Sequence, residues 1–265
     1  GKEYYAIKGI LHFVQDDNVT HCQLYHIDYT EFIECMKKLY IIANWKSNKT
    51  ILQAKEWFQT INNSPVTFNK EEKEVIVCPP FTLLPKVKEL IVNCKSSIVV
   101  GAQNISPFDE GAHTGEVNGR QIKELADYVI VGHSERRKNF GEDEEMVNKK
   151  LDQTLKQGLT PILCVSNLQE VQKSTLRLRS GQELKMMVAY EPLFAIGTGS
   201  PDNPESADSV GRKIKEILGE APVLYGGSVT SGNVRSFTSM PHIGGVLVGG
   251  ASLDPLEFLK IIKNA

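Results

Sequence analysis

Three ionisable side chains stand at the ends of short apolar runs in this sequence: Lys46, His133 and Glu191. A carboxylate can act as a general base, an imidazole can polarise a carbonyl group, and an ammonium group can stabilise a developing negative charge. If the three runs are strands that end at one place, these groups could move a proton next to a carbonyl group. Each signal alone is weak, because a lone lysine at a loop start is more often solvated and a lone histidine more often structural.

The residues beside these three strengthen the hypothesis. Asn44 lies two positions before Lys46, and because side chains alternate along a strand, the amide and the ammonium group point the same way. Pro192 follows Glu191 directly and biases the glutamate toward extended backbone rather than helix. Glu191 is therefore the candidate general base, placed at the end of a run whose other residues suit a buried strand.

Two later runs end in glycine rather than in charge, at Gly226-Gly227-Ser228 and at Gly249-Gly250. Glycine lets backbone N–H groups approach a ligand closely, so these two turns could cradle an anion such as a phosphate group. A single Gly-Gly pair is more often only a tight turn, but two pairs on adjacent strands favour the cradle. Because the sequence shows no metal-binding cluster and no cofactor fingerprint, we predict proton transfer on a small phosphorylated substrate without metal or cofactor.

The elements that must position these residues follow a regular alternation. Segments with helical spacing, such as 51–61, 144–158 and 206–220, separate eight short runs rich in Val and Ile. The runs are 39–43, 75–78, 98–102, 128–132, 161–165, 186–190, 223–225 and 245–248. This rhythm predicts a (β/α)8 barrel, a fold of about 250 residues that carries its chemistry at the carboxyl ends of its strands. A doubly wound open sheet is the competing architecture, but the glycine-rich turn it would require after the first run is missing.

Composition and charge narrow the function classes. The chain is 41% hydrophobic with a formal net charge of −2, which does not indicate a nucleic-acid or membrane-surface binder. Its five cysteines form no CxxC pair, so we expect reduced thiols and a cytoplasmic location. Residues 36–265 suffice for one barrel domain, whereas 1–35 show no clear period. We interpret 1–35 as an N-terminal extension of unknown role.

Six segments together resemble one family, in the order in which that family has them. They read NWK, GAHTGE, VGHSERR, AYEPLFAIGTG, YGGSV and LVGGASL. On these segments, the chain from about Met36 to its C-terminus resembles the triosephosphate isomerases. The resemblance implies a TIM barrel that interconverts dihydroxyacetone phosphate and D-glyceraldehyde 3-phosphate without a cofactor, in glycolysis and gluconeogenesis.

The resemblance also assigns roles to individual residues. Glu191 would be the base that carries a proton between the two carbons, and His133 would polarise the carbonyl group. Lys46 and Asn44 would stabilise the enediolate intermediate. The supporting residues would be Glu135, Ser134 and Tyr225, and the phosphate-binding residues Gly197, Ser228, Gly249 and Gly250.

Two loops gain a function from the same resemblance. The stretch after Glu191 resembles the lid for which this family is a well-known example, with Tyr225 and Ser228 catching it when it closes. The loop at 104–116 resembles one that inserts into a second copy of the chain, with Thr114 and Gln103 as its residues of interest. A homodimer is therefore expected.

The sequence departs from the family at three places. Phe194 and Asn167 stand where the family usually has Trp and Glu, so we predict altered lid closure with the chemistry retained. The connection between Cys164 and Ala189 is short, and Ser200-Pro201-Asp202 replaces a usual lysine and small residues. Two alternatives stay open: a catalytically silent barrel that serves as a binding protein, and an isomerase of another phosphosugar, whose larger substrate would need a more open lid.

Overall fold

The computed structural model describes residues 38–265, except for 69, 93, 95–96, 176–184 and 196–198. The chain divides into two units, Gly1–Met36 and Lys37–Ala265, and the described residues all belong to the second. The predicted extension at 1–35 and the predicted phosphate ligand Gly197 therefore lie outside the described residues.

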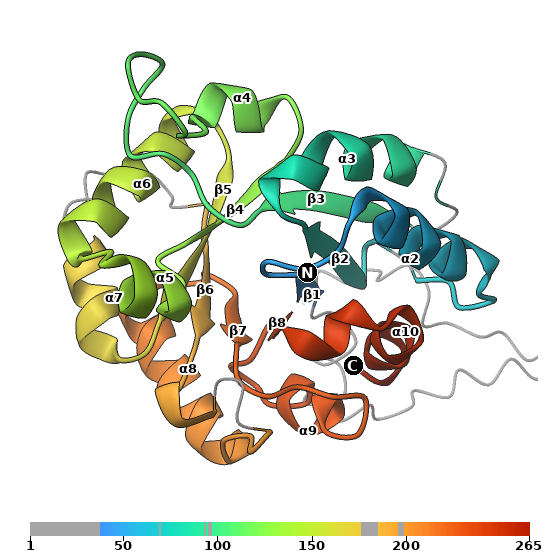
Figure 1. Cartoon of the computed structure of the whole chain (residues 1–265). Coiled ribbons are helices and arrows are strands. Elements are labelled where there is room, and N and C mark those ends of the chain that lie inside the picture. The colour runs from blue at the N-terminus through green and yellow to red at the C-terminus, as the bar shows by residue number, and fades with distance from the viewer. Residues whose placement is uncertain (1–37, 69, 93, 95–96, 176–184, 196–198) are drawn as a thin grey trace, which may run out of the picture. The chain divides into compact units, whose positions relative to one another are not determined.

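Eight parallel strands close into a barrel in chain order, and helices surround them (Figure 1). Pairing of β1 with β8, in which Tyr40 lies opposite Gly245, completes the ring. The strands are β1 Leu39–Asn44, β2 Lys73–Cys78, β3 Ile98–Ala102, β4 Tyr128–Val131, β5 Thr160–Val165, β6 Met187–Tyr190, β7 Val223–Tyr225 and β8 Gly245–Val248. Each lies within two residues of a predicted run, and the predicted (β/α)8 fold is confirmed. β5 and β6 pair in parallel, so the short connection between them is compatible with closure.

The helices begin at residues suited to the task. Thr50 and Gln53 form a capping box at the start of the first helix, in which each side chain accepts a hydrogen bond from the backbone N–H of the other residue. Asn203 caps a later helix, whose first residue is Pro204. The α-helices are α2 Ile51–Asn63, α3 Leu84–Val92, α4 Gly119–Lys123, α5 Ser134–Phe140, α6 Glu144–Lys156, α7 Leu168–Thr175, α8 Pro204–Leu218, α9 Val234–Thr238 and α10 Pro255–Asn264. In the described residues, 3-10 turns accompany them at η1 Phe81–Leu83, η2 Leu193–Ala195 and η3 Gly250–Leu253.

Alternation along the strands decides which side chains reach the barrel interior. Ile42 belongs to the inner core of the barrel, whereas its neighbour Ile41 packs in the outer core between strands and helices. Asn44 follows Ile42 by two residues, so its side chain points inward at the carboxyl end of β1. Glu191 follows the inner-core residue Ala189 in the same way. The barrel therefore delivers both groups to one end.

Within the described part of the chain, none of the helices combines the length and the apolar character that a membrane span requires.

Candidate active site

A cavity of about 240 Å³ opens at the carboxyl ends of the strands. Residues from the ends of β1, β4, β6, β7 and β8 line it, so five strand ends far apart in the sequence meet there. The lining residues are Asn44, Lys46, His133, Glu191, Gly199, Gly226, Gly227, Ser228, Val229, Thr230, Leu247, Gly249, Gly250 and Ala251. The convergence of strand ends that the sequence predicts is present in the structure.

Glu191 and His133 form a buried pair at the mouth of the barrel. The Glu191 side chain is 2% exposed, and its Oε1 lies 3.2 Å from His133 Nε2. Its Oε2 accepts a hydrogen bond from the backbone N–H of Ser134 at 3.0 Å. Both carboxylate oxygens are thus occupied by groups from the start of α5, which fixes the direction of the side chain.

The hydrogen bonds around His133 define its tautomer. The backbone N–H of Glu135 donates to His133 Nδ1 at 3.2 Å, so Nδ1 carries no proton. The proton of the neutral imidazole is then on Nε2, the atom that faces Glu191 and the cavity. An imidazole in this form can donate a hydrogen bond to a carbonyl oxygen of a bound ligand.

Gly132 turns His133 toward the cavity. Ile130 lies in the inner core, so simple alternation would send Gly132 inward and His133 outward. Gly132 instead has φ 71°, and a Cβ built on it would meet Arg137 and Val147 outside the barrel. Because L side chains rarely adopt this conformation, a glycine is required where the chain reverses the alternation.

Lys46 has left-handed backbone, with φ 50°, which is uncommon for a residue with a side chain. Three hydrogen bonds hold it: its N–H donates to Asn44 Oδ1 at 3.0 Å, its C=O accepts from Gln103 Nε2 at 2.9 Å, and its Nζ donates to Glu135 Oε1 at 2.7 Å. Strained backbone persists only where the surroundings over-determine it. These bonds hold the ammonium group at the cavity.

Comparison with known proteins decides the family. The family profile described as "Triosephosphate isomerase" matches residues 39–265, which is most of the chain and the whole barrel. The chain belongs to the triosephosphate isomerase family. It is therefore an isomerase, and its substrate class is a triose phosphate.

Curated relatives named triosephosphate isomerase agree over nearly their full length. The one from Synechococcus sp. (strain JA-2-3B'a(2-13)) is 43% identical over 245 residues, covering 86% of this chain and 97% of the relative. The one from Trichodesmium erythraeum is 41% identical, covering 86% and 99%. The one from Aquifex aeolicus is 38% identical, covering 86% and 100%.

Two hydrogen bonds flank residues 196–198, in the stretch that the sequence predicts to be a lid. Ser228 Oγ donates to the carbonyl oxygen of Ala195 at 2.8 Å, before the undescribed residues 196–198. After them, the backbone N–H of Asp202 donates to the Tyr225 hydroxyl at 2.8 Å. Tyr225 is fully buried, and burial raises the pKa of its phenol to about 12, so the hydroxyl stays protonated at neutral pH.

Asn167, one of the departures from the family pattern, has a local role. Its Oδ1 accepts from the backbone N–H of Glu170 at 3.0 Å, and its Nδ2 donates to Glu170 Oε1 at 2.9 Å. Ser166 N–H donates to the other carboxylate oxygen of Glu170 at 2.8 Å. Asn167 therefore caps α7, and the Asn-x-x-Glu spacing in the sequence is the signal of such a cap.

Phe194, the other departure from the family pattern named with Asn167, is 63% exposed.

The remaining predicted residues lie in two places. Thr114 is exposed on the loop at 104–116 and does not line the cavity. Gln103, which the resemblance groups with that loop, lies against its own chain and also donates to Cys78 O at 2.8 Å. Through its hydrogen bonds to Lys46 O and Cys78 O, the Gln103 side chain links the loop after β1 to the end of β2. The described residues hold no group of three or more His, Cys, Asp or Glu side chains that could bind a metal ion.

Sequence reasoning missed the contact of Cys164 with the candidate base. The Cys164 thiol is 1% exposed, and burial, together with the neighbouring Glu191 carboxylate, raises its pKa well above the usual value. The thiol is therefore protonated at neutral pH, the form that is not nucleophilic. Arg137 was missed as well: its Nε donates to Gly132 O at 2.7 Å and fixes the turn before His133. Nothing in the sequence spacing reveals the first contact, because it joins two different strands.

Proposed function

We propose that this isomerase interconverts dihydroxyacetone phosphate and D-glyceraldehyde 3-phosphate, with Glu191 carrying the proton between C1 and C2. The observation that carries the proposal is the buried Glu191–His133 pair, with 3.2 Å between Oε1 and Nε2 at the mouth of the barrel. A base and a hydrogen-bond donor that line the same cavity side by side can both reach one small carbonyl compound bound in that cavity. Membership of the family supports the substrate.

In the proposed reaction the Glu191 carboxylate removes a proton from C1 of dihydroxyacetone phosphate. The C–H electron pair forms a C1–C2 double bond, and the C2 carbonyl oxygen gains negative charge. His133 donates its Nε2 proton to that oxygen and takes the proton of the C1 hydroxyl, which leaves the imidazole neutral again. Glu191 returns its proton to C2, giving the aldehyde at C1. Lys46 and Asn44 supply positive charge and an N–H donor to the enediolate oxygens.

The phosphate group belongs on the glycine side of the cavity. Ser228, Gly249 and Gly250 line it, and they come from the turns after β7 and β8. Gly249 also leaves room for the catalytic lysine, because a Cβ there would lie 3.2 Å from Lys46 Cε and 3.5 Å from Nζ. Gly197 is proposed as a fourth ligand on the family resemblance alone.

We further propose a lid, a homodimer and a location. The lid is the stretch after Glu191, which includes Phe194, and its closure should differ from that of Trp-bearing relatives because the Phe194 side chain has no N–H to donate. The homodimer would form through the loop at 104–116, which is held on its own subunit by an ion pair of 2.7 Å between Lys156 and Asp109. Reduced thiols and the reaction itself favour a cytoplasmic enzyme of glycolysis and gluconeogenesis.

The test is turnover of D-glyceraldehyde 3-phosphate by wild-type protein and by Glu191→Gln. The variant keeps the size of the side chain but cannot accept a proton, so kcat should fall by about 10²- to 10⁴-fold. Glu124→Gln, a change of the same kind at an exposed position, is the control and should keep wild-type kcat. A folded wild-type protein without turnover would contradict the proposed function and favour the catalytically silent barrel.

A further inference from the structure

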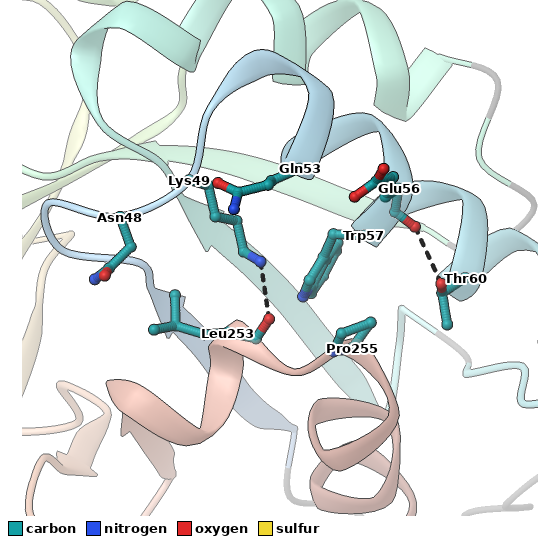
Figure 2. A pocket seen from close by; sticks show the side chains of 8 residues that line it. All are labelled: Asn48, Lys49, Gln53, Glu56, Trp57, Thr60, Leu253 and Pro255. Carbon is teal, nitrogen blue, oxygen red and sulfur yellow. Dashed lines mark hydrogen bonds between the residues drawn. The ribbon is translucent and has the colours of Figure 1, made fainter.

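Lys49 connects two loops that meet at the catalytic cavity. It follows Lys46 by three residues in the loop after β1. Its Nζ donates a hydrogen bond of 2.8 Å to the carbonyl oxygen of Leu253, the last residue of η3 (Figure 2). The first residue of η3, Gly250, lines the catalytic cavity. One side chain thus joins the loop of the catalytic lysine to the turn proposed to bind phosphate.

A second donor reaches the same turn. Trp57 Nε1 of α2 donates to Ser252 O at 3.1 Å, and Ser252 closes the turn by donating from Oγ to Gly249 O at 2.6 Å. Two consecutive carbonyl groups of η3, those of Ser252 and Leu253, are therefore held from outside. The amide groups at Gly249 and Gly250 lie on the same short turn, so their positions depend on these anchors.

The space around the anchors is not filled by side chains. Lys49, Trp57, Leu253 and Pro255 line an open cavity of about 480 Å³ between α2 and the turn that leads into α10 (Figure 2). On the side of this cavity, hydrogen bonds supplement the packing of Trp57 against Phe258 of α10. The Lys49 bond therefore carries more of the positioning than it would inside a packed core.

The conformation of Lys49 is costly for a residue that served only as a solvated charge. Its φ is 72°, a left-handed value that L side chains rarely adopt. Its Nζ lies 5.2 Å from the centroid of the buried Trp45 ring, and burial lowers the pKa of the ammonium group. The left-handed backbone and the partial burial of the charge are both costs, and the cation–π contact with Trp45 offsets part of them. A residue held against such costs is characteristically fixed by its surroundings.

We propose that Lys49 is a positioning residue for the phosphate group of the substrate, acting through the turn at 249–253. The inference rests on the proposed function, because the phosphate site is part of it. Lys46 has its own bonds to Asn44, Gln103 and Glu135, so loss of Lys49 should leave the catalytic lysine in place. The effect should appear in phosphate affinity and not in the proton transfer.

The experiment compares Lys49→Met with Lys55→Met, a matched change at an exposed position of α2. We measure kcat and KM for D-glyceraldehyde 3-phosphate, and the dissociation constant of inorganic phosphate by calorimetry. For Lys49→Met, KM and the phosphate constant should rise together by about three- to tenfold, with kcat changed by less than about twofold. Lys49→Arg, which keeps N–H donors on a long side chain, should restore most of the affinity. Lys55→Met should match the wild type.

Three results would overturn the inference: unchanged phosphate affinity in folded Lys49→Met, an equal effect of Lys55→Met, or a fall in kcat with KM unchanged. If Lys49→Met does not fold, Lys49→Asn replaces it with the same expected results, because Asn tolerates left-handed backbone and is too short to reach Leu253. Calorimetry on Glu191→Gln separates the two proposals. If Glu191→Gln and the double variant with Lys49→Met bind phosphate equally well, the role of Lys49 is contradicted but the proposed function is not. If the wild-type protein shows no turnover, the proposed function is contradicted.

Discussion

The two sides of the cavity are built by different means. At the ends of β1, β4 and β6 the chemistry lies in side chains, and each of these side chains is held by polar contacts at its own functional atoms. Glu191, for example, is bound through both carboxylate oxygens and is almost completely buried. At the ends of β7 and β8 the cavity is lined largely by glycine backbone, whose positions depend on contacts outside the cavity such as those of Lys49 and Trp57.

This difference corresponds to two tasks of the cavity, proton transfer and recognition of the phosphate group. Proton transfer needs groups fixed to within a few tenths of an ångström, and direct side-chain bonds provide that. Recognition of a phosphate group needs several N–H donors at once, which backbone at glycine-rich turns can supply. Substitutions on the first side should therefore lower kcat, and those on the second should mainly raise KM.

After Glu191→Gln, the largest of these effects should come from His133→Gln. Glutamine can donate a hydrogen bond but cannot take back a proton, so kcat should fall by about 10²- to 10³-fold while KM changes little. Steady-state kinetics checks this, with His242→Gln as the control, because His242 contacts Asp208 of α8 and does not line the cavity. A variant that keeps more than about a tenth of wild-type kcat would show that the imidazole does not move protons in this enzyme.

Gly249→Ala tests the boundary between the two sides. The new Cβ would lie 3.2 Å from Lys46 Cε, so the lysine must shift by a few tenths of an ångström. We expect kcat to fall and KM to rise, so that kcat/KM is lower by about ten- to a hundredfold. Gly232→Ala, whose Cβ would meet only Thr230 Oγ1 at 3.7 Å, is the matched control. Equal kinetics for the two variants would mean that the contact with Lys46 does not matter.

The smallest effect concerns Tyr225 and alkaline pH. Burial raises the pKa of this phenol from 10.0 to about 12, so between these values the unfolded chain releases a proton that the folded chain keeps. The free energy of unfolding is therefore greatest below pH 10 and falls toward pH 12, by about 1.4 kcal/mol per pH unit at most for this group. Tyr225→Phe should lose less stability over this window than the wild type in denaturant titrations. If the wild type and Tyr225→Phe lose the same free energy of unfolding over this window, the raised pKa of Tyr225 is contradicted.

Much of this architecture can be predicted from the sequence. The features that cannot be predicted share one cause. The strand runs and the residues at their ends predict the barrel and the meeting of Lys46, His133 and Glu191. The reversal at Gly132 is not predicted, because alternation alone sends His133 outward. The bond between Gln103 and Lys46 O joins residues 57 positions apart, and that between Lys49 and Leu253 joins residues 204 apart. Such contacts depend on how strands and loops meet in space, which periodicity does not encode.

The central claim is that Glu191 carries the proton, and isomerisation in heavy water tests it most directly. D-glyceraldehyde 3-phosphate is converted in D₂O by wild-type protein and by Glu191→Gln, and deuterium at C1 of the dihydroxyacetone phosphate is measured by NMR. Because a carboxylic acid proton exchanges with solvent, the wild type should place deuterium at C1, and the variant should do so about 10²- to 10⁴-fold more slowly. Equal rates of deuterium incorporation by the two proteins would contradict the account.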